Sequence, residues 1–445
     1  MMSKEKEFKM ELTFERSFLP TRSSNIKIIA YVAGDIDEKL FSAAVHKLSL
    51  KHPYLRSKVV MRADGTAYLT TEGGKEPETI IVTGSSNADV LNVIYQEDQK
   101  PSNWEIDPTS RFSLIKGVNG SDVIVAYIHH VIADGRSTAF VLKHLLEFIA
   151  DPAKEVVELI PSSLLKNAPV DVVIPEIQKA YTEKINTDWE KQKVTFGVDD
   201  FIEVARKKYA SGPDVHMDQS LTQDETLTLR NKSKEQGVSV NAALLAAILI
   251  AKIAEETEPT PNNLGFAVDV RKRLSKDAGE ACNLLASGAM VAPEYKEGLG
   301  FWDFAKDIHR KTLQTLASNQ NLFGTRMLSQ LMDPTFNDAM YMFQQGDWEG
   351  TPLIKQMGGQ GAPVGAVLTN LGGMQLPAEY QGVHPIKLSD AIFYPPIGIE
   401  KVIELGASSL LGKLHLVTLS PQNAANRELK ERIIPRIIGI LKENL

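Results

Sequence analysis

The sequence predicts an α/β protein with two domains, and three observations support this fold class. The chain has 445 residues, more than one hydrophobic core usually supports. Helical and strand patterns alternate irregularly in both halves. Between the halves, residues 151–215 contain prolines in charged, weakly periodic sequence, which is typical of a long crossover linker. We therefore expect an N-terminal domain over residues 1–200 and a C-terminal domain over residues 201–445.

Local patterns predict the elements of the first half in order. Apolar residues at helical spacing indicate a helix over residues 37–51. Strand patterns follow over residues 58–61 and 67–70, with an Asp-Gly pair at the turn between them. The remaining elements expected here are a helix over 87–97, a buried strand over 123–128 and a helix over 137–150.

The second half begins with a strand over residues 215–221 and a helix from Thr222. The first turn of this helix is acidic, which suits the positive end of the helix dipole. Ser239 is the expected N-cap of an apolar helix over 240–254. The remaining elements expected are helices over 301–319 and 428–441, the second kinked at Pro435, and strands over 264–270, 366–369, 392–394 and 413–419.

Composition is that of an ordinary globular protein, with 43% hydrophobic and 24% charged residues. The net charge of −7 argues against nucleic acid or an anionic membrane as the main partner. The longest apolar run, 242–251, is shorter than the roughly 20 residues that a membrane span needs. The charged N-terminus lacks an apolar signal core. We therefore expect a cytoplasmic protein without an integral membrane segment.

The single cysteine, Cys282, excludes an intramolecular disulfide and fits a reducing compartment. It lies in an apolar stretch without the Gly-rich surroundings of a nucleophile. We therefore expect a small buried residue at this position.

The segment Tyr127–Thr138, YIHHVIADGRST, is the most informative part of the chain. His129 and His130 end the apolar strand, and an Asp134-Gly135 pair follows after three residues. Neutral imidazole has a pKa of about 6.5, so it can take a proton from an alcohol, thiol or amine. No metal site is expected, because neighbouring side chains of a strand point to opposite faces and no cluster nearby supplies further ligands.

This motif resembles that of the HHxxxDG acyltransferase superfamily, which includes chloramphenicol acetyltransferase, plant BAHD acyltransferases and condensation domains of nonribosomal peptide synthetases. The chain looks nearest to its alcohol acetyltransferases and polyketide-associated acyltransferases. Five further landmarks occur in the family's order: Leu48–Arg56, Trp104–Leu114, Gly237–Ala247, Val268–Leu274 and Leu368–Gly372. The resemblance implies two chloramphenicol acetyltransferase-like α/β sandwich domains, with the active-site tunnel at their interface.

The resemblance also implies a role for each residue of the motif. His130 would be the general base, and His129 a packing and hydrogen-bonding neighbour. Asp134 would point away from the imidazole and pair with Arg271 from the other half of the chain. Gly135 would permit the tight turn.

Thr369 and Asn370 stand at the end of an expected strand, before a Gly-Gly pair. Donors at this position could stabilise the oxyanion of a tetrahedral intermediate. A plain turn that contains Asn explains the same residues equally well.

The expected function is transfer of an acyl group from a thioester, acyl-CoA, to a hydroxyl group in a ternary complex. No tightly bound cofactor is expected, since acyl-CoA is a co-substrate. One alternative is a donor carried by an acyl carrier protein in trans, and a second is amide formation with an amine acceptor. A third, from another class, is a non-catalytic binding scaffold with the same fold.

Overall fold

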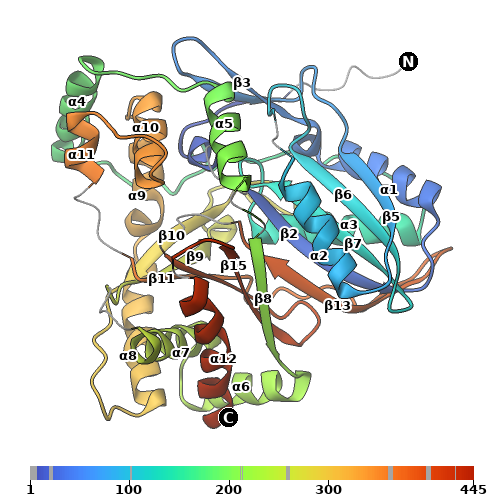
Figure 1. Cartoon of the computed structure of the whole chain (residues 1–445). Coiled ribbons are helices and arrows are strands. Elements are labelled where there is room, and N and C mark those ends of the chain that lie inside the picture. Colours follow the sequence, from blue (N-terminus) through green and yellow to red (C-terminus); the bar gives the residue numbers. More distant parts are fainter. Residues whose placement is uncertain are drawn as a thin grey trace.

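The computed structural model describes residues 8–19, 24–100, 103–210, 212, 214–256, 261–358, 364–396, 402–425 and 427–445. The described strands form two six-stranded sheets and one three-stranded sheet (Figure 1). The three-stranded sheet has the order β1-β4-β3 and consists of β1 (Lys9–Glu11), β4 (Ala67–Thr70) and β3 (Lys58–Met61). Short 3-10 helices span Phe14–Phe18, Pro53–Arg56 and Arg271–Arg273.

The first six-stranded sheet has the strand order β12-β13-β2-β7-β6-β5. Its strands are β12 (Glu379–Tyr380), β13 (Ile386–Tyr394), β2 (Asn25–Ala33), β7 (Ser121–His129), β6 (Ser110–Val118) and β5 (Glu78–Thr83). β2 and β7 pair antiparallel along their whole length, with Asn25 opposite His129. This pairing places the end of β7 beside the start of β2 in the middle of the sheet.

Helices cover both faces of this sheet. α1 (Glu38–Lys51) and α3 (Gly135–Ala150) pack on one face, where Ile124, Ala126 and Ile128 join the core. α2 (Asn87–Asp98) covers the other face, where the alternate residues of β7 are also buried. Because both faces are buried, β7 is a continuous apolar run rather than an alternating one.

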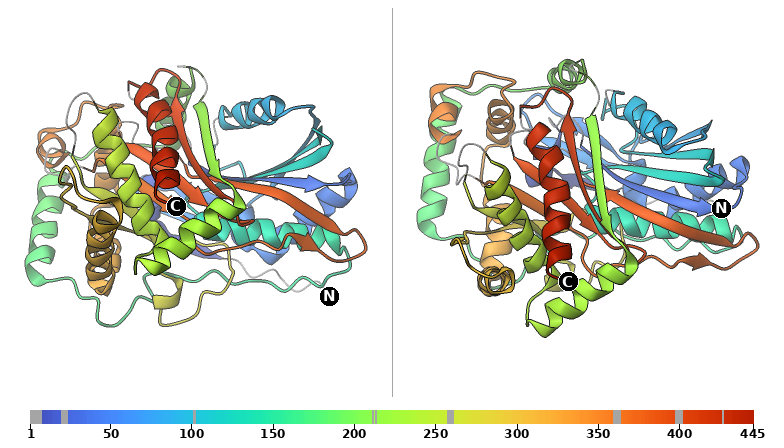
Figure 2. Two further views of the ribbon diagram at one scale, coloured as in Figure 1. Left: turned by 90° about the horizontal axis from the view of Figure 1, so that it is seen from below. Right: turned by 60° about the horizontal axis from the view of Figure 1, so that its bottom comes forward.

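The second six-stranded sheet has the order β10-β9-β11-β14-β15-β8. Its strands are β10 (Ala286–Val291), β9 (Leu264–Asp269), β11 (Ala366–Asn370), β14 (Ile403–Ser408), β15 (Leu414–Pro421) and β8 (Asp214–Leu221). One face packs with α6 (Gln223–Glu235), α7 (Val240–Glu255), α8 (Phe301–Leu316) and α12 (Arg427–Glu443) (Figures 1 and 2). The sheet is mixed, with β9, β11 and β14 parallel to one another.

The two halves of the chain exchange strands. β12 and β13 come from residues 379–394, yet they complete the sheet of the first half, where Phe393 lies opposite Ile28 of β2. The expected domain division at residues 200 and 201 stays a prediction.

Residues 151–215 were expected to form an irregular crossover linker. The structure corrects this expectation, because the region contains two helices. They are α4 (Glu176–Glu190) and α5 (Val198–Tyr209). α4 buries only a narrow face, and its Trp189 packs edge-on against Phe336 at 5.6 Å between ring centroids. Such a narrow stripe within charged sequence produces only a weak helical periodicity.

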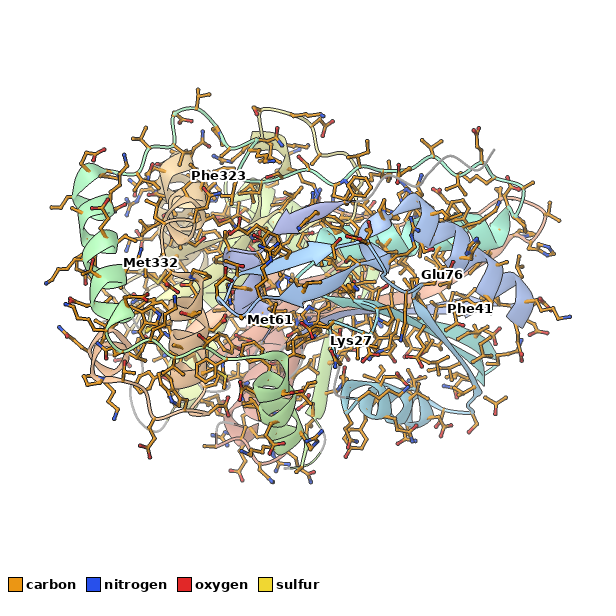
Figure 3. All side chains as sticks on the ribbon, turned by 90° about the horizontal axis from the view of Figure 1, so that it is seen from above. Lys27, Phe41, Met61, Glu76, Phe323 and Met332 are labelled. Carbon is orange, nitrogen blue, oxygen red and sulfur yellow. The ribbon has the colours of Figure 1, made fainter. Side chains whose placement is uncertain are left out.

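The helix expected over 301–319 is α8, which ends at Leu316, and the side chain of Ser318 caps the next helix, α9 (Asn319–Ser329). Two more helices follow, α10 (Pro334–Gln344) and α11 (Pro352–Gly358). Figure 3 shows Lys27 of β2 between Phe41 of α1 on one side and Phe323 of α9 on the other. The cap expected at Ser239 is confirmed, since its side chain accepts a hydrogen bond from the N–H of Ala242.

Among the described residues, no single helix is long and apolar enough to cross a bilayer. α6 and α7 reach that length and hydropathy only as a pair, and they are bent by 102° relative to each other.

Candidate active site

His130 follows directly after β7 and lines a cavity of about 220 Å³ between the two large sheets. Its backbone N–H donates to the carbonyl oxygen of Ser24 at 2.7 Å. Its ring stacks against Phe18, with 3.9 Å between ring centroids. The first sheet contributes Ile26 and Phe393 to the cavity wall. The backbone and a neighbouring ring thus hold the imidazole at the meeting point of both sheets.

The hydrogen bonds of His130 determine its tautomer. Nδ1 lies 2.7 Å from the carbonyl oxygen of Ala133. A carbonyl oxygen only accepts hydrogen bonds, so Nδ1 carries the proton and donates it. Nε2 of the neutral ring therefore has a free lone pair. This question could not be answered from the sequence.

The pKa of His130 is lowered to about 4. Burial is the largest cause, because the charged ring loses its hydration, and the Arg326 guanidinium adds to the effect. The carbonyl of Ala133 and the carboxylate of Asp134 oppose it only in part. His130 is therefore neutral at cellular pH and available as a proton acceptor.

His129 has a different environment. It is buried, and its Nδ1 accepts a hydrogen bond from the N–H of Val131 at 3.2 Å. Its ring packs edge-on against Trp104 at 5.9 Å between centroids. Burial lowers its pKa to about 3, and the neighbouring His130 contributes to the shift. These contacts suit the packing role expected for His129.

Asp134 is turned away from the imidazole, as expected. Its carboxylate accepts hydrogen bonds from the N–H groups of Ser137 and Leu285, each at 2.8 Å. The Ser137 bond caps α3 at its N-terminus. An ion pair with Arg271 completes the set, with 3.0 Å between Nη2 and Oδ1. The ion pair that the resemblance implied is confirmed.

The charge state of this pair follows from its partners. Burial by itself would raise the pKa of Asp134, but the Arg271 guanidinium and the two N–H donors outweigh it and lower the pKa. Arg271 also binds Asp269 at 2.9 Å. Both members of the pair are therefore charged, and they join α3 of the first half to the end of β9.

Gly135 lines the cavity. The expectation that glycine is needed here to permit a tight turn is wrong. It is the first residue of α3, and its φ is not positive. A Cβ at this position would lie 2.6 Å from Cδ2 of Leu371 and 2.8 Å from Cε2 of Phe393. Glycine is needed because two side chains approach its backbone closely, and not because of a strained turn.

The structure separates Thr369 from Asn370. Thr369 lines the cavity of His130. Asn370 lines another cavity of about 380 Å³, where its amide donates to Asn241 at 3.2 Å and its Oδ1 accepts from the N–H of Gly372 at 2.9 Å. Adjacent side chains on β11 point to opposite faces, which accounts for the difference. Only Thr369 is placed beside the candidate base.

Three residues near His130 were not foreseen from the sequence. Phe18 stacks on the imidazole, and Glu404 of β14 lines the same cavity. Arg326 of α9 is buried, binds Glu15 at 3.1 Å and donates to the carbonyl oxygen of Ala286 at 2.6 Å. None of the three lies in a sequence motif, and the only available signal was that Arg326 is a cation in an otherwise uncharged helix segment.

Cys282 is buried, as expected. Its thiol donates to the carbonyl oxygen of Ile132 at 3.6 Å. Burial raises the pKa of the thiol far above its ordinary range. A thiol in this state is a poor nucleophile.

Comparison with known proteins gives a consistent picture. A family model described as "Condensation domain" matches residues 11–271. The phthiocerol/phthiodiolone dimycocerosyl transferase of Mycobacterium ulcerans is 26% identical over 283 residues, which are 60% of this chain and 63% of that protein. Bacitracin synthase 3 of Bacillus licheniformis is 30% identical over 125 residues. The chain therefore spans less than two thirds of the length of the mycobacterial relative. It spans 2% of the length of bacitracin synthase 3.

Two solved structures show the same fold. The starter condensation domain of rhizomide synthetase, in complex with C8-CoA, has a TM-score of 0.63 and 13% identity, covering 96% of this chain and 91% of that one. The trichothecene 15-O-acetyltransferase of Fusarium sporotrichioides has a TM-score of 0.67 and 12% identity, covering 100% and 96%. The predicted two-lobed acyltransferase fold is confirmed. The condensation domain family model matches more than half of the chain, so the chain belongs to the condensation domain family.

Proposed function

We propose that the protein transfers an acyl group from a thioester to a hydroxyl group, with Nε2 of His130 as the general base. The observation that carries this proposal is the hydrogen bond from Nδ1 to Ala133. It leaves the only free lone pair of the ring on a side chain that lines the cavity. The names of the mycobacterial and fungal relatives, a transferase and an O-acetyltransferase, support the same reaction type.

In the proposed reaction, the acceptor hydroxyl donates its proton to Nε2 while its oxygen attacks the thioester carbonyl. The new C–O bond produces a tetrahedral oxyanion, and the Thr369 hydroxyl is the proposed donor to that oxygen. Collapse of the intermediate breaks the C–S bond. The leaving thiolate takes the proton from Nε2, which restores the neutral base.

Transfer is direct in this proposal, because the buried thiol of Cys282 has a raised pKa and is unsuited to carry the acyl group. The donor that we propose is acyl-CoA, since a structure of similar fold contains C8-CoA. A donor on an acyl carrier protein is the alternative. A cytoplasmic location also remains a proposal.

The test is release of free thiol from acyl-CoA in the presence of an alcohol, compared with the same acyl group on a carrier protein. Turnover that requires the acceptor, with an unchanged intact mass of the protein after incubation with donor alone, supports direct transfer. An acyl adduct that forms and decays at the catalytic rate contradicts it. No thiol release from either donor would favour a non-catalytic binding scaffold.

A second candidate is amide formation with an amine acceptor. The condensation domain family supports it, and the Glu404 side chain on the cavity wall would favour entry of a basic acceptor, which attacks as the neutral amine after losing a proton. Glu404→Gln should then reduce kcat/KM for amines more than for alcohols of the same carbon skeleton. An equal reduction for both acceptors would remove this candidate.

A further inference from the structure

The two large sheets meet at β13 and β15, and a buried histidine lies in this contact. Figure 1 shows β8 and β15 of the second sheet next to β13 of the first sheet. Val417 of β15 shares an apolar core with Ile392 of β13. His415 of β15 is only 1% exposed and is not among the described residues that line the cavity of His130. It is therefore a titratable group that the proposed reaction does not use.

Both nitrogens of the His415 ring face a carboxylate. Nδ1 lies 3.1 Å from Oδ1 of Asp218 in β8, on its own sheet. Nε2 lies 2.9 Å from Oδ1 of Asp390 in β13, on the other sheet. A carboxylate only accepts hydrogen bonds, so both ring nitrogens must carry a proton to make the two bonds. The geometry therefore requires the imidazolium form. We call His415 with Asp218 and Asp390 the intersheet ion cluster.

Strand register brings these three side chains together. Val417 lies opposite Asp218 in the antiparallel pair of β15 and β8, so His415, two residues before Val417, is a diagonal neighbour of Asp218 on the same face. The pairing of β13 with β2 shifts its register between Leu388 and Asp390. An irregularity of this kind re-aims a side chain. The cluster thus depends on three strands that are far apart in the sequence.

Four other titratable groups surround the cluster. The Lys413 ammonium binds Oδ2 of Asp390 at 3.0 Å. Burial raises the pKa of Tyr31 in β2 and of Tyr394 in β13, so both phenols stay neutral. Burial also lowers the pKa of His216 in β8 to about 3, so this ring has no proton to lose. Since imidazole titrates nearest to neutral pH, the imidazole of the cluster is the one of these described groups whose charge changes there.

The two carboxylates hold the proton on His415. Burial by itself would lower the pKa of His415, but the hydrogen bonds and charges of Asp218 and Asp390 outweigh it and raise the pKa. The side chains of Asp218 and Asp390 are 30% and 24% exposed, which gives the ring proton a route to solvent. A neutral ring donates only one hydrogen bond, so loss of the proton leaves one carboxylate without its partner.

The cluster joins strands that also form the walls of the cavity of His130. Asp390 belongs to β13, which contributes Phe393 to the cavity wall. His415 belongs to β15, which pairs with β14, and β14 contributes Glu404 to the wall. A weaker contact between the sheets would therefore act on both walls of the cavity.

We propose that the intersheet ion cluster is a proton-dependent contact that holds the two large sheets together around the cavity of His130, closed while His415 carries its proton and weakened when the proton is lost. This inference goes beyond the proposed acyl transfer, and its test requires no turnover.

The direction of the pH dependence follows from the raised pKa of His415. The closed form is fully favoured below about pH 6.5, the ordinary pKa of the ring. As the pH rises from there, the equilibrium constant for opening grows by up to about tenfold per pH unit, until the pH passes the pKa of the closed form. The pair of Asp134 with Arg271 keeps its charge over this range, because a guanidinium titrates above about pH 12.

Nuclear magnetic resonance titration of His415, with its signal assigned from His415→Gln, tests the protonation. Half-protonation should lie above about pH 6.5. Asp390→Asn should lower this midpoint by about 1–3 pH units, because it removes one counter-charge. Asp218→Asn should act in the same direction, so the cluster is still tested if one of the two variants does not fold. A wild-type midpoint at or below about pH 6.5 would overturn the inference.

Opening is measured by the distance between two nitroxide labels, one on a helix of each sheet. The labels are attached to Lys39→Cys in α1 and Lys306→Cys in α8, both at exposed positions. Cys282 is the only cysteine of the chain and is buried, so it does not compete for the label. The wild-type protein should show one distance at about pH 6 and an additional longer distance at about pH 9. Asp390→Asn should show the longer distance already at about pH 7.

Glu379→Gln is the matched control, because it removes a carboxylate of the first sheet whose contact with Lys387 is exposed. It should keep the wild-type midpoint and the wild-type distances. Equal label distances at all three pH values, in the wild type and in Asp390→Asn, would overturn the inference and leave the proposed acyl transfer in place. A longer distance that appears as early in Glu379→Gln as in Asp390→Asn would also overturn it, since the effect would not be specific to the cluster.

Discussion

The carboxylate of Asp134 and the guanidinium of Arg271 lie 3.0 Å apart, although 137 positions separate them in the sequence. Both side chains are buried, and each comes from a different six-stranded sheet or its adjoining helix. The pair fixes the loop after His130 to the second half of the chain. Its carboxylate binds N–H groups and Arg271 rather than the imidazole, and these contacts favour a positioning role over a catalytic one.

Breaking this pair from one side should destabilise the protein. Asp134→Asn and Arg271→Ala should each cost about 3–5 kcal/mol, because the remaining partner is left buried without its counter-charge. The double variant should lose less than the sum of the two. Thermal and denaturant unfolding measure this coupling. Lys306→Ala, which removes an exposed ion pair with Asp303, serves as the control and should change little.

The same two variants test whether Asp134 has a positioning role or a catalytic one. If Asp134→Asn abolished turnover in a protein of unchanged stability, Asp134 would belong to the catalytic machinery. Additive effects of the two substitutions would show that the pair is not coupled.

His130→Ala should lower the rate of acyl transfer by about a hundred- to ten-thousand-fold, because it removes the proposed general base. Donor affinity should remain near that of the wild type. His129→Ala should reduce the rate less and stability more, since His129 is buried against Trp104. His46→Ala, at an exposed position where Nδ1 contacts the Glu76 carboxylate, is the matched histidine control. Near wild-type turnover of His130→Ala would refute the mechanism.

The pH dependence of activity should reflect the lowered pKa of His130, about 4. The base is active when neutral, so kcat/KM should not fall between about pH 8 and 5.5 because of this group. Nuclear magnetic resonance titration of the imidazole should show half-protonation well below the ordinary value of about 6.5. Loss of activity with a midpoint near 6.5, together with protonation of His130 there, would contradict the assignment.

Stability should decrease on acidification. The pKa values of His129 and His130 are lowered to about 3 and about 4, and those of His144 and His216 to about 4 and about 3. In the unfolded chain these rings bind protons near pH 6.5. The unfolded state therefore binds more protons below about pH 6.5, and stability is lost as the pH falls from there towards 4. Urea unfolding at several pH values measures the slope, and a flat profile over this window would contradict it.

Gly135→Ala should destabilise the fold by about 1–3 kcal/mol, because its Cβ would overlap with Leu371 and Phe393. The matched control is Gly439→Ala in α12, where no atom lies within 4 Å. That change should stabilise the helix by about 0.5–1 kcal/mol. Comparison of the two midpoints in denaturant tests whether close approach, rather than backbone freedom, requires glycine at position 135.

The sequence by itself determined the fold class and the place of His130 at the end of a strand. It also determined the cap at Ser239 and most helix and strand positions. These features depend on residues within one or two turns of each other, so periodicity and cap chemistry reveal them. The ion pair of Asp134 with Arg271 was foreseen only through the resemblance, since nothing local connects residues so far apart.

The tertiary structure alone decided the features that depend on contacts between distant segments. The tautomer of His130 follows from how its loop folds back towards Ala133. The need for Gly135 comes from Leu371 and Phe393 in the other half of the chain. The separation of Thr369 from Asn370 follows from the way β11 faces its neighbours in the sheet, with one side chain on each face. Register decides which side chains share a face, and it is set by hydrogen bonds between strands that a local pattern does not contain.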